Sequence, residues 1–158
     1  MLSKTNTYFE KLRAEGDAYE EKKRALEDRK QKIIDTCGWD SGELKAWYEE
    51  KEKLTFPIPA GACKAYRAWM QSIEHENEEL QMDDFLWERE VSDFVDCLRK
   101  AGISTFVYTN QSTAVMENLH ELTKAGCHMD GLCTIKRWER RFGENKEEEI
   151  LGIHFTVC

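Results

Sequence analysis

The sequence predicts an α+β protein in which an N-terminal helical hairpin or bundle precedes an α-β-α-β-β unit with a small three-stranded mixed sheet. Three observations lead to this prediction. Apolar residues recur at helical spacing through the first third of the chain, the two prolines stand close together at positions 57 and 59, and strand-like alternation appears in the last third. The predicted domains are a long helical hairpin over residues 1–56 and an α+β domain over residues 60–158, packed as one compact unit.

One long helix is expected from about residue 7 to residue 35. An apolar residue recurs there every seven positions, at Leu12, Tyr19, Leu26 and Ile33. The stripe is narrow, and the second apolar heptad position of a coiled coil is charged here, so a hairpin within the chain is favoured over a coiled-coil dimer. Cys37-Gly38 ends this helix, and Asp40 or Ser41 can cap a second helix that returns antiparallel to it. The shared face of the second helix carries Leu44, Trp47, Tyr48 and Leu54.

The two prolines mark the internal boundary, because each removes a backbone donor and disfavours helix in the preceding residue. A third helix then carries Cys63, Tyr66, Met70 and Ile73 on one face. A fourth helix has its apolar face over about 86–98 and ends at Lys100-Ala101-Gly102. It leads into the clearest strand of the chain, 103–109. The final elements are a helix over about 115–122 that Ser112 or Thr113 can cap, and strands at 132–142 and 150–157. The strands on either side of that helix are expected to be parallel through a right-handed crossover, and the final hairpin antiparallel.

The composition places the chain among acidic proteins of the cytoplasm. Its 158 residues carry a net charge of −8, and 34% of them are charged. No apolar run approaches the length of a membrane span, and the N-terminus lacks the apolar core of a signal peptide. The six cysteines form no C-x-x-C pair, so we expect scattered, partly buried thiols rather than a disulfide framework.

The strongest anomaly is a carboxylate-rich segment from Glu74 to Asp96, called the acidic segment below. It holds ten carboxylates and the single cation Arg89, which sum to −9 against −8 for the whole chain. One interpretation is a solvated linker and helix start, where carboxylates also favour the helix dipole. The other is an acidic surface that attracts a basic partner or imitates the phosphate charge of a nucleic acid.

Direct binding of nucleic acid and a metal site are both disfavoured by the sequence. The basic residues Lys136, Arg137, Arg140 and Arg141 surround Trp138, but glutamates beside them and across the predicted turn would neutralise them. His120, Cys127, His128 and Cys133 match no zinc-binding spacing. We therefore expect no metal and no cofactor.

The alternative is a small enzyme or ligand-binding domain, although the sequence holds no G-x-G-x-x-G, Walker A or G-x-S-x-G motif. The turn at residues 109–113 joins a predicted strand to a helix, a place where backbone amides bind anions and where α/β sheets hold ligands. Asn110 and Ser112 are the candidate ligand-binding residues there. Helix capping explains the same residues without a ligand.

Residues 94–155 resemble a group of uncharacterised small proteins encoded on bacterial mobile elements and phages. The resemblance rests on Lys100-Ala101-Gly102, Phe106-x-Tyr108-Thr109-Asn110-Gln111-Ser112-Thr113, Ala125-Gly126-Cys127, Gly131-Leu132-Cys133 and Gly152-Ile153-His154-Phe155. It implies a context in which small acidic proteins disable host defences, including CRISPR effectors that hold nucleic acid in positively charged channels.

The predicted function is that of a non-enzymatic binding protein directed at a basic protein surface, such as that of a nucleic-acid-binding effector. Its sharpest form is an anti-CRISPR inhibitor. A further hypothesis is a scaffold role, in which the long N-terminal helix pairs with a helix of a partner protein. The predicted contact residues are Glu76, Glu78, Glu79, Asp83, Asp84 and Glu88.

Overall fold

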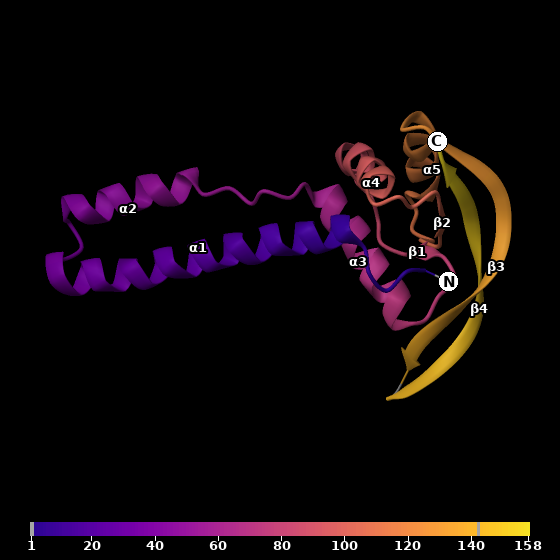
Figure 1. The fold of residues 1–158 in the computed structure, drawn as a ribbon, viewed down its shortest axis with the longest axis horizontal. Helices are drawn as coiled ribbons and strands as arrows, with labels where there is room; N and C mark the ends of the chain where they lie inside the picture. Colours follow the sequence, from indigo (N-terminus) through magenta and orange to yellow (C-terminus); the bar gives the residue numbers. More distant parts are fainter. Residues whose placement is uncertain (1, 142) are drawn as a thin grey trace. The chain divides into compact units, whose positions relative to one another are not determined.

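The computed structural model describes residues 2–141 and 143–158, without the side chains of residues 138–141, 144 and 145. It has the α+β class that the sequence predicts, with an N-terminal helical region and a mixed sheet (Figure 1). The elements in chain order are α1 (Thr7–Cys37), α2 (Gly42–Lys53), α3 (Ala60–Glu74), β1 (Leu80–Met82), α4 (Glu88–Lys100), β2 (Thr105–Tyr108), α5 (Val115–Lys124), β3 (Cys127–Arg141) and β4 (Glu144–Val157).

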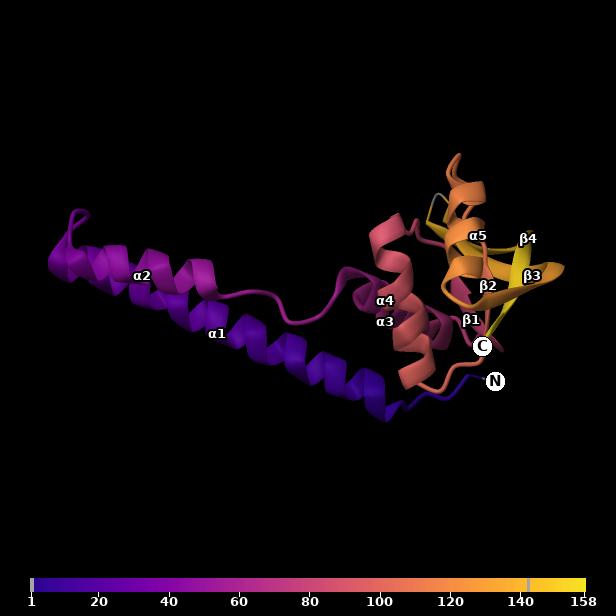
Figure 2. The same ribbon diagram turned by 90° about the horizontal axis from the view of Figure 1, so that it is seen from above.

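The chain divides into two compact units, Glu10–Ile58 and a second unit that joins Met1–Phe9 to Pro59–Cys158. In the first unit, α1 and α2 form an antiparallel hairpin (Figures 1 and 2). Its small core consists of Leu26, Leu44 and Trp47, and the Trp47 indole N–H donates to the carbonyl of Leu26 at 2.7 Å. Ser41 caps α2 by accepting from the Leu44 amide, one of the two caps that the sequence predicts.

The sheet of the second unit has four strands in the order β1-β2-β4-β3, one more than the sequence predicts. β1 lies parallel to β2, and β4 pairs antiparallel with both β2 and β3. The predicted strands on either side of α5 run in the same direction, but β4 lies between them. Strand β1 was missed because three residues are too short for an alternation pattern to stand out within the acidic segment.

The last two strands are longer than predicted. β3 begins at Cys127 rather than 132, and β4 begins at Glu144 rather than 150. The added residues of β4 are mostly charged and therefore lack the apolar alternation that marks a half-buried strand. A cross-strand ion pair between Lys136 and Glu147, at 3.2 Å, links the two strands in this part of the hairpin.

Helices α4 and α5 lie side by side along one face of the sheet (Figure 2). Phe94 of α4 packs on Phe106 of β2 at 5.5 Å between ring centroids, and Phe106 stacks on Phe155 of β4 at 5.3 Å. All three rings are fully buried. The strands' alternation thus turns Phe106 and Phe155 toward the helices and places Val107 and His154 on the other face.

The predicted cap of α5 is wrong. The N-cap position is Ala114, which offers no side-chain acceptor, and α5 begins at Val115. Ser112 takes part through its backbone instead, because its carbonyl accepts from the Val115 amide at 3.1 Å. A backbone hydrogen bond in the turn therefore precedes α5, where a side-chain hydroxyl cap was predicted.

No helix in the described part of the chain is both long enough and apolar enough to cross a bilayer.

Candidate functional site

The candidate site lies on the face of the sheet opposite α4 and α5. Alternation places Val107 of β2 and His154 of β4 on this face, where the register makes them direct cross-strand neighbours. Gly152 lies on the same face two residues earlier. A Cβ atom at Gly152 would come within 2.4 Å of the Cγ1 atom of Val107. Glycine at position 152 is therefore what allows β4 to pass this close to β2.

The outer part of the β3–β4 hairpin approaches β1, although two strands separate β1 from β3 in the sheet. The side-chain amide of Gln81 donates to the carbonyl of Lys136 at 3.4 Å. The guanidinium of Arg137 pairs with the carboxylate of Asp83, just after β1, at 3.1 Å. The long hairpin is strongly curved (Figure 1). Its curvature turns this face of the sheet into a hollow.

The main cavity in this hollow, called the acidic groove below, has a volume of about 660 Å³. Its apolar lining residues, called the floor below, include Val107 and Ile135. Five carboxylates line it from two separate parts of the chain: Glu76, Glu78, Glu79, Glu147 and Glu149. The remaining lining residues are His75, Asn77, Gln81, Cys133, Thr134, Lys136 and His154. A cationic ligand with an apolar portion fits this combination of a charged rim and an apolar floor.

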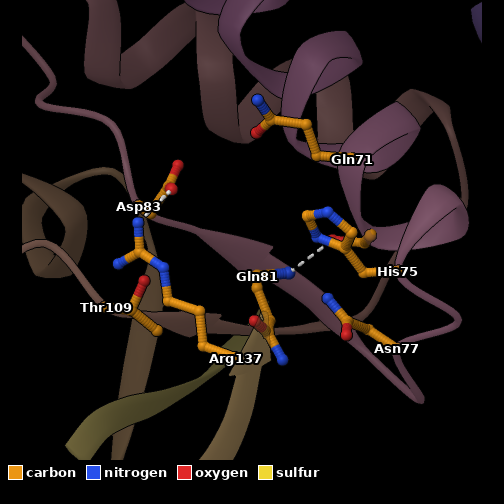
Figure 3. A pocket seen from close by; sticks show the side chains of 8 residues that line it. Gln71, His75, Asn77, Gln81, Asp83, Thr109 and Arg137 are labelled. Carbon is orange, nitrogen blue, oxygen red and sulfur yellow. Dashed lines mark hydrogen bonds and ion pairs between the residues drawn. The ribbon is translucent and has the colours of Figure 1, made fainter. Parts of the chain in front are cut away.

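A smaller polar pocket of about 90 Å³ adjoins the acidic groove and shares His75, Asn77 and Gln81 with it (Figure 3). Figure 3 shows the Arg137 side chain reaching from β3 toward Asp83, with Thr109 beside it. A third cavity of about 290 Å³ continues from this ion pair to Asn110. Shared lining residues therefore make one continuous polar band from the 109–113 turn to the acidic groove.

A hydrogen-bonded chain of titratable groups crosses the same face. The imidazole Nδ1 of His154 lies 2.7 Å from Asp130, and its Nε2 lies 3.2 Å from Glu79. The other oxygen of Asp130 lies 2.8 Å from Nδ1 of His128. Two threonine hydroxyls donate to the carboxylates: Thr105 to Glu79 and Thr156 to Asp130, each at 2.8 Å.

These contacts shift three pKa values. Hydrogen bonds from His128, His154 and Thr156 lower the pKa of Asp130 to about 2. Burial alone would raise the pKa of Glu79, but hydrogen bonds from Thr105 and His154 outweigh it and lower the pKa. The hydrogen bond to Asp130, supported by Glu79, raises the pKa of His154 despite its partial burial. Both carboxylates are therefore ionised at neutral pH, and together they favour the protonated form of the His154 imidazole.

The acidic segment does not form a single exposed face. Glu76 and Glu78 are exposed at the acidic groove, and Glu79 is partly covered there. Asp83 pairs with Arg137, and Asp84 lies 3.4 Å from Arg67 and accepts from the Phe85 amide at 2.8 Å. Glu88 is exposed in the first turn of α4 and lines none of the three cavities. Three of the six predicted contact residues thus come together at the groove.

One carboxylate of the acidic segment is a core residue. Glu90 is buried and pairs with Lys64 of α3 at 2.7 Å, and it also accepts from the Trp87 amide at 3.0 Å. Burial would raise the pKa of Glu90, but the Lys64 ammonium and the Trp87 amide hold it below its ordinary value. This residue stabilises the fold and is unavailable to a partner.

The alternative ligand-binding residues are used within the chain itself. The side-chain amide of Asn110 donates to the carbonyl of Asp83 at 2.9 Å, and its oxygen accepts from the Ser112 amide at 2.9 Å. Ser112 is exposed. Both ends of the Asn110 amide therefore hold the turn in shape, and a ligand role for Asn110 and Ser112 stays a prediction.

The part of the chain that the structure describes contains no group of three or more His, Cys, Asp and Glu side chains arranged to hold a metal ion. The six cysteines are not joined by disulfides. Cys97 and Cys127 are buried, and burial raises the pKa of Cys97 to about 12 and that of Cys127 to about 11. These two thiols are therefore protonated at neutral pH and unreactive as nucleophiles.

The residues that sequence reasoning missed are His154, Asp130, Glu147 and Glu149. A signal for His154 was present, because it alternates with buried apolar residues in the last strand and so must lie on the opposite face. Glu147 and Glu149 appeared only as neighbours of the basic residues across the turn. Nothing local in the sequence connects them to Glu76 and Glu78, about 70 residues earlier.

The fold and the site define a mixed α+β protein that carries a carboxylate-lined groove on one face of its sheet. Residues 64–157 match the family described as Domain of unknown function (DUF7698), and the chain belongs to this family. The match runs from α3 to the end of β4 and so includes every residue of the acidic groove. No curated protein and no solved structure matches the chain.

Proposed function

We propose that this protein is a non-enzymatic binding protein that holds an extended, basic segment of a partner protein in the acidic groove. The observation that carries the proposal is the gathering of five carboxylates around an apolar floor, from the segment before β1 and from β4. Only Lys136 supplies a fixed positive charge among the lining residues, and it is already paired with Glu147. The groove therefore has a surplus of negative charge for a partner to neutralise.

The apolar lining adds to the affinity, mainly through the half-buried Ile135, because Val107 is already almost fully buried. Single exposed ion pairs contribute only about 0.2–1 kcal/mol each, so the carboxylates alone would bind weakly. An extended chain turns alternate side chains to opposite sides. A segment that alternates basic and apolar residues can therefore place the apolar ones toward Val107 and Ile135 and the basic ones at the rim. The carboxylates then provide orientation and a fast, salt-sensitive association.

In its sharpest form, the proposal is an inhibitor of a nucleic-acid-handling enzyme of the CRISPR type, encoded by a phage or another mobile element. Such an enzyme presents a cationic channel that an acidic protein can occupy in place of nucleic acid. The five carboxylates that line the groove support this form, since their combined charge is comparable to the phosphate charge of a few nucleotides. Glu76, Glu78 and Glu79 would make the first contacts, with Asp83, Asp84 and Glu88 adding longer-range attraction.

The test is the binding of a defined probe, an end-capped octapeptide of alternating lysine and valine, measured by fluorescence anisotropy at several salt concentrations. A variant with Glu76, Glu78, Glu147 and Glu149 all replaced by glutamine should lose most of the binding and most of its salt dependence. The matched control replaces four exposed glutamates of the helical hairpin by glutamine: Glu21, Glu43, Glu49 and Glu52. Both variants change the net charge equally.

If both variants weaken binding equally, the effect comes from overall charge and the groove is not the site. If the wild-type protein does not bind the peptide at low salt, the proposed occupant of the groove is wrong. A competition assay extends the test to the inhibitor form: the protein should displace DNA from a CRISPR effector, and the groove variant should not.

A further inference from the structure

The environment of His154 is unusual because both ring nitrogens face carboxylates. Nδ1 lies 2.7 Å from Asp130 and Nε2 lies 3.2 Å from Glu79. An ionised carboxylate can only accept hydrogen bonds, so both contacts are hydrogen bonds only when both nitrogens carry a proton. The geometry is therefore that of an imidazolium ion held between two carboxylates.

Each element around this imidazole contributes identifiable groups. β3 contributes Asp130, His128 and Cys133, and the segment before β1 contributes Glu79. β2 and β4 contribute the hydroxyls of Thr105 and Thr156, which bond to the same carboxylates. Burial, and Glu79 beside it, raise the pKa of Cys133, so this thiol stays neutral. The other titratable groups that line the groove with His154 are His75, Glu76, Glu78, Lys136, Glu147 and Glu149.

His154 and a partner's cation need the same carboxylate. Glu79 lines the acidic groove, and the imidazolium engages its Oε1 atom from within the protein. We propose that protonated His154 acts as an internal competitor for Glu79, so that loss of its proton opens the acidic groove to basic ligands. This inference rests on the proposed function for the identity of the ligand, but the contact itself is a property of the free protein.

The two contacts of the ring respond differently to deprotonation. The Asp130 contact is shorter by half an ångström and Asp130 is held by three donors, whereas Glu79 is held by Thr105 and His154. The remaining ring proton therefore stays on Nδ1, and the bare Nε2 turns its lone pair toward Glu79. Two acceptors then face each other, and the Glu79 carboxylate is free to pair with a ligand cation. By linkage, a bound cationic ligand lowers the pKa of His154 to the same extent.

The first experiment needs no ligand. The ring proton signals of His154 are followed by NMR from pH 5 to 9 in the full-length wild-type protein and in Glu79→Gln, with His120, an exposed residue of α5, as an internal reference. The substitution should lower the pKa of His154 and leave that of His120 unchanged, since it removes one of the two carboxylates that stabilise the imidazolium. An unchanged pKa of His154 would overturn the proposed contact.

The second experiment measures the affinity of the alternating lysine–valine octapeptide between pH 5.5 and 8.5, where its lysines stay charged. Affinity should rise about two- to fivefold as His154 loses its proton, the effect of one recovered ion pair at a solvent-accessible site. The His154→Gln variant should lose this rise, and the His120→Gln control should keep it. A rise of equal size in His154→Gln would assign it to another group and refute the competition. If the peptide binds at no pH, the proposed function fails while the NMR result still decides the contact.

Discussion

Helices α3 and α4 approach each other so closely at Gly61 that adding a single methyl group there should force them apart. A Cβ atom at this position would lie 2.1 Å from the carbonyl oxygen of Glu90 and 2.7 Å from the amide nitrogen of Phe94. Both are backbone atoms, which no rotamer change can move away. Ordinary carbon–oxygen contacts are about 3.3 Å or longer, so Gly61→Ala requires the helices to move apart by roughly 1 Å.

The expected cost combines two opposing contributions. Overpacking a well-packed contact costs about 1–3 kcal/mol, and the upper value applies because the obstruction is backbone. Alanine offsets about 1 kcal/mol of this through its higher helix propensity. The net loss in the free energy of unfolding is therefore about 2 kcal/mol, which lowers Tm by about 8 °C in a domain of this size. Thermal unfolding followed by far-ultraviolet circular dichroism measures it.

Gly42→Ala is the matched control. Gly42 is the first residue of α2, and nothing lies within 4 Å of a Cβ atom built on it. This variant should unfold at the wild-type temperature or slightly above it. If Gly61→Ala is as stable as the wild type, the close approach of α3 and α4 is wrong. If both variants lose equal stability, the loss reflects glycine replacement in general rather than the helix contact.

Three further predictions concern the same unit. Glu90→Gln leaves the partly buried Lys64 ammonium without its carboxylate and should cost about 3 kcal/mol in urea unfolding. Glu88→Gln, on the exposed face of the same helix, should cost less than about 0.5 kcal/mol, and equal effects would refute the burial argument. Asn118→Leu removes the partner of the Leu86 backbone and should lower the free energy of unfolding by about 2 kcal/mol, and an unchanged value would contradict those hydrogen bonds. The pKa of His154 is raised in the folded state, so its contribution to stability is complete below the unfolded-state pKa of about 6.5 and disappears as pH rises through the folded-state pKa. The urea midpoint of the wild type should therefore fall over that pH range relative to the midpoint of His154→Gln. Midpoints that change in parallel for the two proteins would refute this prediction.

Local patterns account for most of the helical structure. The seven-residue recurrence of apolar residues places α1, and the Gly38 and Ser41 signals place the turn into α2. These predictions succeed because helix periodicity and capping depend on residues within a few positions of each other. The prediction of the α5 cap is wrong because the turn before α5 depends on a contact that is distant in the sequence. Asn110 bonds to the Ser112 amide and to the Asp83 carbonyl, and the second of these contacts spans 27 positions.

The candidate site could be predicted only in part. The acidic segment was visible as a run of charge, and Glu76, Glu78 and Glu79 do line the groove. The sequence could not separate them from Glu90, which lies in the same run but pairs with Lys64 in the core. All four glutamates carry the same formal charge, whereas the burial of each one depends on whether its side of the chain faces a neighbouring helix.

The sequence by itself determined the class of the protein, the position of nearly every helix and the surplus of negative charge, because all three depend on composition and on short-range spacing. Only the tertiary structure decided that β4 lies between β2 and β3 and that the β3–β4 hairpin curves back toward β1. That arrangement brings Glu149 to the same groove as Glu76 and sets His154 between Asp130 and Glu79. The physical reason is that strand pairing is made by backbone hydrogen bonds, which every residue except proline offers, so strand order leaves no mark on any one strand's sequence.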